Sequence, residues 1–87
     1  MEWFQKAADQ GDSHGQYDLA ICYYHGTGVE MDKEKAVKWH WKAAEQGHSD
    51  AQFNLGFCYE NGIGVEMDME QAVEWYRKAA EQGHSDA

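Results

Sequence analysis

The chain has 87 residues, of which 16 are acidic and 7 are basic, so its formal net charge at pH 7 is −9. This acidic excess argues against nucleic acid and anionic membranes as partners, and it favours basic or neutral partners. No stretch reaches the roughly 20 apolar residues of a transmembrane helix, and we expect no signal peptide in these residues. The sequence therefore does not indicate a cellular compartment. With 14% aromatic residues, the chain is expected to fold as one small domain.

A repeat of 36 residues organises the sequence. The string KAAEQGHSDAQ at 42–52 returns as KAAEQGHSDA at 78–87, and a looser copy, KAADQGDSHGQ, occupies 6–16. Residues 15–50 and 51–86 are identical at 23 of 36 positions. A period of this length predicts a stack of similar structural units, each burying its apolar face against the next.

In chain order, the first segment is a partial helix over residues 2–10, which correspond to 38–46 in the next unit. The first complete repeat, 13–46, is predicted to hold one helix over about 13–25 and a second over about 33–46. The connecting residues read GTGVEMD, a polar loop with two glycines.

The second complete repeat, 49–82, has the same plan, with predicted helices over about 49–61 and 69–82. Residues 83–87 are a stub of a further repeat. We therefore treat 1–87 as a single repeat domain with an incomplete unit at each end. Neither end carries a dedicated polar cap.

The helix ends have recognisable residues. Gly26 and Gly62 are expected to stop the first helix of each repeat, and Asp32 and Asp68 are expected to cap the second. Gly47 lies where a chain that leaves a helix needs positive φ, and the HSD run after it offers the next N-cap. No strand-like alternation interrupts this pattern.

Comparing the two repeats separates two faces of the first helix in each repeat. Positions that are identical in both copies share one face, as expected for residues that stack; they are Gln16, Leu19, Cys22 and Tyr23, with Gln52, Leu55, Cys58 and Tyr59. Positions that differ share the opposite face, with the residues Tyr17, Asp18, Ile21, Tyr24 and His25 in one copy and Phe53, Asn54, Phe57, Glu60 and Asn61 in the other.

These residues resemble a known family. The matching positions are Ala36, Trp39, Lys42, Ala43, Ala44, Gln46, Gly47, Ala51, Gln52, Leu55, Gly56, Tyr59, Gly62, Gly64, Val65 and Asp68. Their pattern is similar to the Sel1-like repeat, a relative of the tetratricopeptide repeat, over essentially the whole chain. The resemblance implies an all-α fold, an α/α solenoid whose first helices line a concave surface. It also implies an adaptor that binds a protein or peptide and is not an enzyme.

The variable face of the first helices is the candidate partner-binding surface, because in a solenoid these faces lie side by side. Aromatic anchors ringed by hydrogen-bonding groups suit peptide binding. The simpler alternative is that these positions differ only because they are exposed.

A second hypothesis is a structural or self-assembling repeat fragment, which forms homo-oligomers through its open ends. Trp41 replaces Gln5 and Arg77 of the other copies and is expected on the solvent-facing side of its helix, so it is a candidate for self-association together with Trp3 and Phe4. A lone exposed aromatic residue is also common without any partner.

Metal and catalytic sites are weakly indicated. Cys22 and His25 have a C-x-x-H spacing, but no second pair completes four ligands, so we expect no metal and no cofactor. Cys22 and Cys58 recur at one repeat position and are expected to be buried thiols. The G-x-G strings of the loops lack the rest of a phosphate-binding motif, and no catalytic serine motif is present.

Overall fold

The computed structural model describes residue 6 and residues 9–82. This part of the chain contains helices and loops but no strand, and its four helices are α2 (Ser13–His25), α3 (Lys33–Glu45), α4 (Ser49–Asn61) and α5 (Met69–Glu81). The predicted all-α class is confirmed. The predicted ends agree with these bounds, except that α3 and α5 each stop one residue earlier than predicted, at a C-cap glutamine.

Side chains and glycines fix the helix ends as the sequence predicts. Asp32 accepts a hydrogen bond from the backbone N–H of Lys35, and Asp68 accepts from Gln71, so each aspartate satisfies an otherwise unpaired N–H of the first helical turn. Gly26 and Gly62 are the C-caps of α2 and α4, with φ of 72° and 65°. This left-handed backbone turns the chain sharply into the loop at little steric cost.

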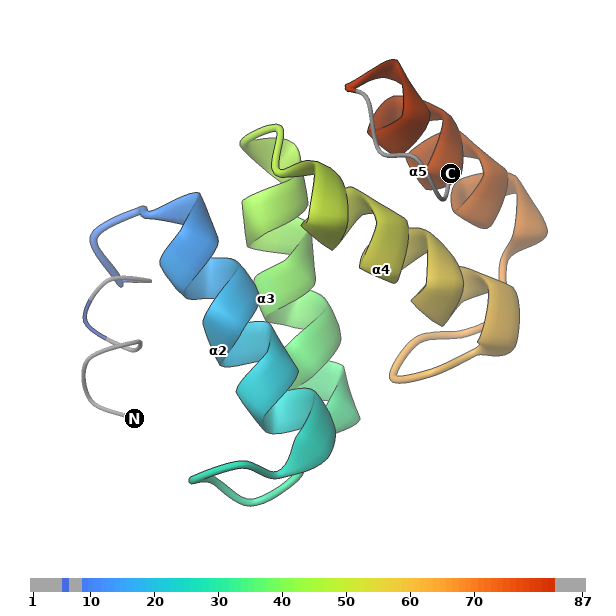
Figure 1. Cartoon of the computed structure of the whole chain (residues 1–87). Helices are drawn as coiled ribbons and strands as arrows, with labels where there is room; N and C mark the ends of the chain where they lie inside the picture. The colour runs from blue at the N-terminus through green and yellow to red at the C-terminus, as the bar shows by residue number, and fades with distance from the viewer. Residues whose placement is uncertain (1–5, 7–8, 83–87) are drawn as a thin grey trace.

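The helices follow one another as two hairpins, α2–α3 and α4–α5, and α3 lies between α2 and α4 (Figure 1). The same hydrogen bonds recur one repeat apart. Gln46 donates to the side chain of Gln16, and Gln82 donates to that of Gln52, both at 2.7 Å. The two repeats are therefore alike in their contacts as well as in sequence.

Small residues let the helices approach closely, while a leucine from each repeat fills the interior. Leu19 and Leu55 are 0% exposed, as are Ala36, Ala43 and Ala72. The loop of the second repeat also lies tightly against the first repeat. A Cβ at Gly64 would collide with the carbonyl oxygen of Lys33, so glycine is required there.

The predicted placement of Trp41 on the solvent-facing side of α3 is wrong. Its ring packs edge-on against Trp75 of α5 with centroids 4.9 Å apart, and its Nε1 donates to the hydroxyl of Tyr59 at 3.1 Å. Trp41 thus joins the two repeats within one chain, which explains a tryptophan there without a second molecule. Trp3 and Phe4, the other candidates for self-association, lie outside the described residues.

None of the described helices is both long enough and apolar enough to cross a membrane.

The molecule measures 33 × 24 × 17 Å along its principal axes. Because the helices lie in one row, the first helix of each repeat faces the same side, and this arrangement creates the site described below.

Candidate functional site

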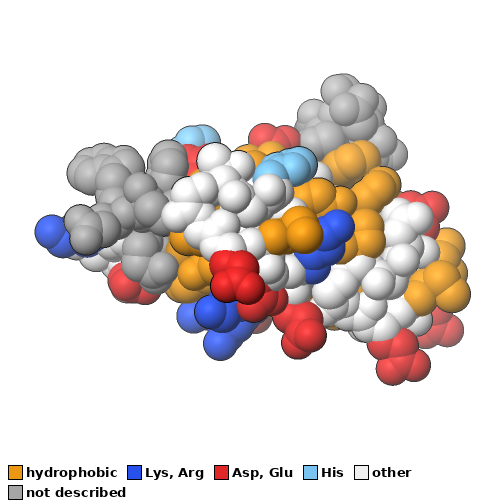
Figure 2. Space-filling model, turned by 90° about the horizontal axis from the view of Figure 1, so that it is seen from below, with side chains coloured by type: hydrophobic (Ala, Val, Ile, Leu, Met, Phe, Trp, Pro, Cys, Tyr) orange, Lys and Arg blue, Asp and Glu red, His pale blue; other side chains and the backbone are white. Residues whose placement is uncertain are grey.

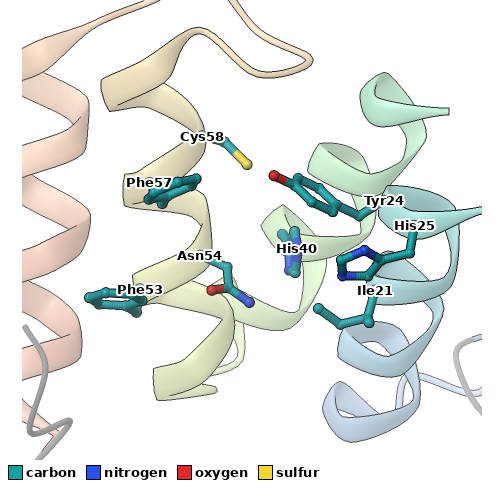
Figure 3. Close-up of a pocket in the computed structure, with 8 residues that line it drawn as sticks. All are labelled: Ile21, Tyr24, His25, His40, Phe53, Asn54, Phe57 and Cys58. Atoms are coloured by element: carbon teal, nitrogen blue, oxygen red, sulfur yellow. The ribbon is translucent and has the colours of Figure 1, made fainter. Parts of the chain in front are cut away.

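A groove of about 270 Å³ opens between α2 and α4. Its walls are side chains from these two helices, and the ring of His40 from α3 lies between them (Figure 3). We call this the α2–α4 groove, defined by the residues Ile21, Tyr24, His25, His40, Phe53, Asn54, Phe57 and Cys58.

The structure places six of the ten predicted partner-binding residues in the lining of this groove. They are Ile21, Tyr24 and His25 from α2 and Phe53, Asn54 and Phe57 from α4. The variable face of the first helices therefore forms one concave surface. That these side chains bind a partner stays a prediction.

The other four predicted residues lie outside the groove lining and make contacts of their own. Asp18 forms an ion pair with His14 at 3.5 Å. Glu60 accepts a hydrogen bond from the Tyr76 hydroxyl at 2.6 Å, and Asn61 caps its own helix by donating to a backbone carbonyl, that of Phe57.

The remaining one, Tyr17, forms one edge of the site. Its ring stacks on His48 with centroids 4.7 Å apart, and its hydroxyl accepts a hydrogen bond from Asn54 at 3.4 Å. Burial raises the pKa of the Tyr17 hydroxyl, which keeps it protonated near neutral pH. Tyr17 and Asn54 thus connect α2 to α4 beside the groove.

The predicted partner-binding residues all lie on the first helices of the repeats, whereas His40 lies on the second helix, α3, and was not among them. His40 is 1% exposed, and burial lowers the pKa of its imidazole to about 4, with a smaller contribution from His48. Its position did carry a pattern, since an aromatic residue recurs there every 36 residues, as Phe4, His40 and Tyr76.

The two cysteines differ in their surroundings. Cys58 is 2% exposed and lies in the core that joins the repeats, where burial raises the pKa of its thiol to about 11. Cys22 is only half-buried, so the expectation of a buried thiol is confirmed for Cys58 and wrong for Cys22. Over the described ranges, no group of three or more metal-ligating side chains is close enough to hold an ion.

The molecule is acidic overall, with 16 acidic and 7 basic residues. Figure 2 shows acidic side chains along one edge of the molecule, with hydrophobic side chains gathered toward the end that carries α4 and α5. One basic group stands at the groove, because the ammonium group of Lys33 lies 4.8 Å from the ring centroid of Tyr24. At this distance the cation and the ring attract each other.

Solved structures with this fold come from several bacteria. A Sel1 repeat protein from Oxalobacter formigenes is 49% identical, with a TM-score of 0.86 over 88% of this chain and 32% of that one. A protective antigen present in uropathogenic Escherichia coli strains, displaying an SLR fold, is 46% identical, with a TM-score of 0.94 over 97% of this chain and 18% of that one. Helicobacter pylori cysteine rich protein B is 29% identical, with a TM-score of 0.94 over 98% of this chain and 64% of that one.

Curated relatives share a shorter segment. DAP3-binding cell death enhancer 1 is 49% identical in Rattus norvegicus and 46% identical in Mus musculus, over 37 residues in each case. The matched segment is 42% of this chain and only 7% of each of these relatives.

The sequence model of the Sel1 repeat matches residues 1–12, 13–48 and 49–84, which together cover nearly the whole chain. The 36-residue period, the four described helices and the similar solved structures agree with this match. The chain belongs to the Sel1 repeat family.

Proposed function

We propose that this chain is a protein-binding module that takes a peptide segment of its partner into the α2–α4 groove. Sel1 repeats are generally protein–protein interaction modules, and Sel1-repeat scaffolds are generally non-enzymatic. The observation that supports the groove most strongly is its content. Six of the ten side chains that differ between the first helices of two otherwise similar repeats line one concave space of about 270 Å³.

The lining suits a peptide with apolar side chains. Phe57 is 42% exposed and lines the groove from α4, while Ile21 and Tyr24 line it from α2 (Figure 3). Partly exposed aromatic side chains in a hollow are where binding energy concentrates in protein interfaces. The Asn54 amide and the Tyr24 hydroxyl add groups that can hydrogen-bond to a peptide backbone.

Charge narrows the class of partner. With a net charge of −9, the chain attracts basic segments and repels acidic ones at moderate salt. A curated relative is named for binding DAP3, which is in keeping with a protein as the ligand. The partner we propose is therefore a peptide segment with apolar anchors and neutral or basic flanks.

The test starts from peptides selected for binding to the wild-type chain from a random library. The double variant Tyr24→Ala/Phe57→Ala should weaken their binding by about 2 kcal/mol, or about 30-fold in Kd, because it removes two central aromatic contacts. Calorimetric titration measures the affinity, and circular dichroism checks that helix content is kept.

A matched control removes two apolar side chains outside the groove. Met69 and Val73 on α5 are 51% and 50% exposed, so Met69→Ala/Val73→Ala should leave the affinity within about twofold of wild type. Equal affinity of the Tyr24→Ala/Phe57→Ala variant and the wild type would show that the peptides bind elsewhere, and the proposal would be wrong.

A further inference from the structure

His40 is a buried polar residue with an unused hydrogen-bonding group. Its side chain lines the α2–α4 groove and is 1% exposed, and its Nδ1 has no hydrogen-bond partner among the described residues. Leaving a buried polar atom unpaired costs free energy, so such atoms normally have a partner in the working state of a protein. A ligand in the groove is one source of that partner.

The second repeat shows how the ring at the same position finds a hydrogen-bond partner within its own repeat. Tyr76 and Glu60 are the equivalents of His40 and Tyr24, 36 residues later. The Tyr76 hydroxyl donates to Glu60 Oε1 at 2.6 Å, so the polar tip of that ring is paired within the repeat. In the first repeat the acidic partner is replaced by Tyr24, and the corresponding pairing is absent from the described contacts.

The small residue that lies next to this ring also differs between the two repeats. A Cβ at Gly56 would lie 3.0 Å from Cδ1 of Tyr76, so glycine makes room for the larger phenol ring. The equivalent pair in the first repeat is Ala20 and His40, with a larger neighbour and a smaller ring. The first repeat thus holds a smaller ring where the second holds a phenol.

The groove lining indicates a neutral ligand with a large apolar body. Among the described residues that line it, none carries a carboxylate or an ammonium group, and the walls include Ile21, Phe53 and Phe57. A charged group placed there would lose hydration, and Lys33, the basic group at the groove, already lies over the ring of Tyr24. An aromatic side chain packs well against such walls.

The chemistry of a neutral imidazole indicates which polar group a ligand should present to His40. Burial favours the uncharged form of His40, in which one ring nitrogen donates and the other accepts. Rotation of the ring about its terminal torsion changes which edge faces the groove. A hydroxyl can donate or accept and so fits either case, whereas an indole N–H can only donate.

Resting on the proposed function, we propose that the α2–α4 groove takes a tyrosine side chain of the partner, whose hydroxyl hydrogen-bonds to the imidazole of His40. The phenol ring lies between Ile21 and Phe57, and the peptide backbone crosses the mouth of the groove. The partner thereby supplies the hydrogen bond that the imidazole of His40 lacks among the described residues. A phenylalanine would fill the same space but leave the imidazole unpaired.

The test uses two small probes that differ by this hydroxyl, 4-methylphenol and toluene. Each is titrated into isotope-labelled wild-type chain, and affinities are read from the chemical shifts of Ile21, Asn54 and Phe57. We expect 4-methylphenol to bind about three- to tenfold more tightly than toluene, as one net hydrogen bond allows. In His40→Phe, which matches the ring at Phe4 of the first copy, the two affinities should be equal.

A second measurement does not depend on the variant. The ¹⁵N resonances of the His40 imidazole should move on adding 4-methylphenol to the wild type and stay in place with toluene. Equal affinities in the wild type, a preference that survives in His40→Phe, or unmoved imidazole resonances would each overturn the proposal. Imidazole resonances that move on dilution alone would place a second copy of the chain in the groove, which also overturns it.

The outcomes separate this inference from the proposed function. If selected peptides require Tyr24 and Phe57 while 4-methylphenol shows no advantage over toluene, the groove binds peptides but does not select tyrosine. If 4-methylphenol binds at His40 while the selected peptides bind elsewhere, the groove accepts a phenol but is not the protein-binding surface.

Discussion

His40 combines burial with a titratable ring, so it connects the groove to the stability of the fold. Burial lowers the pKa of its imidazole to about 4, compared with about 6.5 in an unfolded chain. Between these two values the unfolded chain binds a proton that the folded chain does not. The free energy of unfolding must therefore fall as the pH falls through this range.

His40→Phe should therefore make the free energy of unfolding less dependent on pH. From pH 7 to pH 4, the wild type should lose up to about 3 kcal/mol more than the variant, at about 1.4 kcal/mol for each unit of pKa shift. Urea unfolding at several pH values measures both chains. Because carboxylates and His48 titrate in both, the difference isolates His40, and identical pH dependence in the two chains would contradict its low pKa.

The sequence identified the groove residues on the first helices but not His40 on α3. Comparing the repeats identified Ile21, Tyr24 and Phe57, because positions that do not stack are free to differ and share one side of the first helices. It missed His40, which differs between repeats but belongs to a second helix, whose faces sort less cleanly. Hydrogen bonds such as that between Tyr17 and Asn54 depend on the distance between two helices, which no local pattern specifies.

At the scale of helices, caps and turns were predictable because their causes are local. An aspartate at the N-cap or a glycine in left-handed backbone acts within a few residues. The predicted exposure of Trp41 was wrong because its surroundings are set by residues far away in the sequence. Its position on α3 suggested exposure, but α5 and Tyr59 of the next repeat cover it. The packing of one repeat on another therefore decides which helix face is exposed to solvent.

Trp41→Ala tests whether this residue joins repeats or molecules. Removing a half-buried ring and its hydrogen bond to Tyr59 should lower the free energy of unfolding by about 2 kcal/mol. The molar mass from light scattering should equal that of the wild type at the same concentration. Urea unfolding supplies the first value.

Lys38→Ala is the matched control on the same helix, because Lys38 is exposed. Its stability should stay within about 0.5 kcal/mol of wild type. The self-assembly hypothesis predicts the reverse for Trp41→Ala, a lower molar mass with unchanged stability. That result would indicate that Trp41 lies in an interface between two molecules.

At the scale of the whole molecule, the chain spans only 7% of its curated relatives and 18% to 64% of the similar solved proteins. Sel1 repeats stack in a row, so grooves of neighbouring repeats form one continuous surface. The α2–α4 groove would then be one subsite for one segment of a longer partner. Its binding energy on its own is accordingly expected to be modest.

The most direct test of the account is to locate the bound peptide. A library-selected peptide is titrated into isotope-labelled chain, and shift changes are followed along the sequence. We predict that changes concentrate on Ile21, Tyr24, His40, Phe53 and Phe57, with little change at Met69 and Val73 on α5. Changes centred on α5, with the groove residues unmoved, would contradict the central claim that the variable faces of α2 and α4 form the binding site.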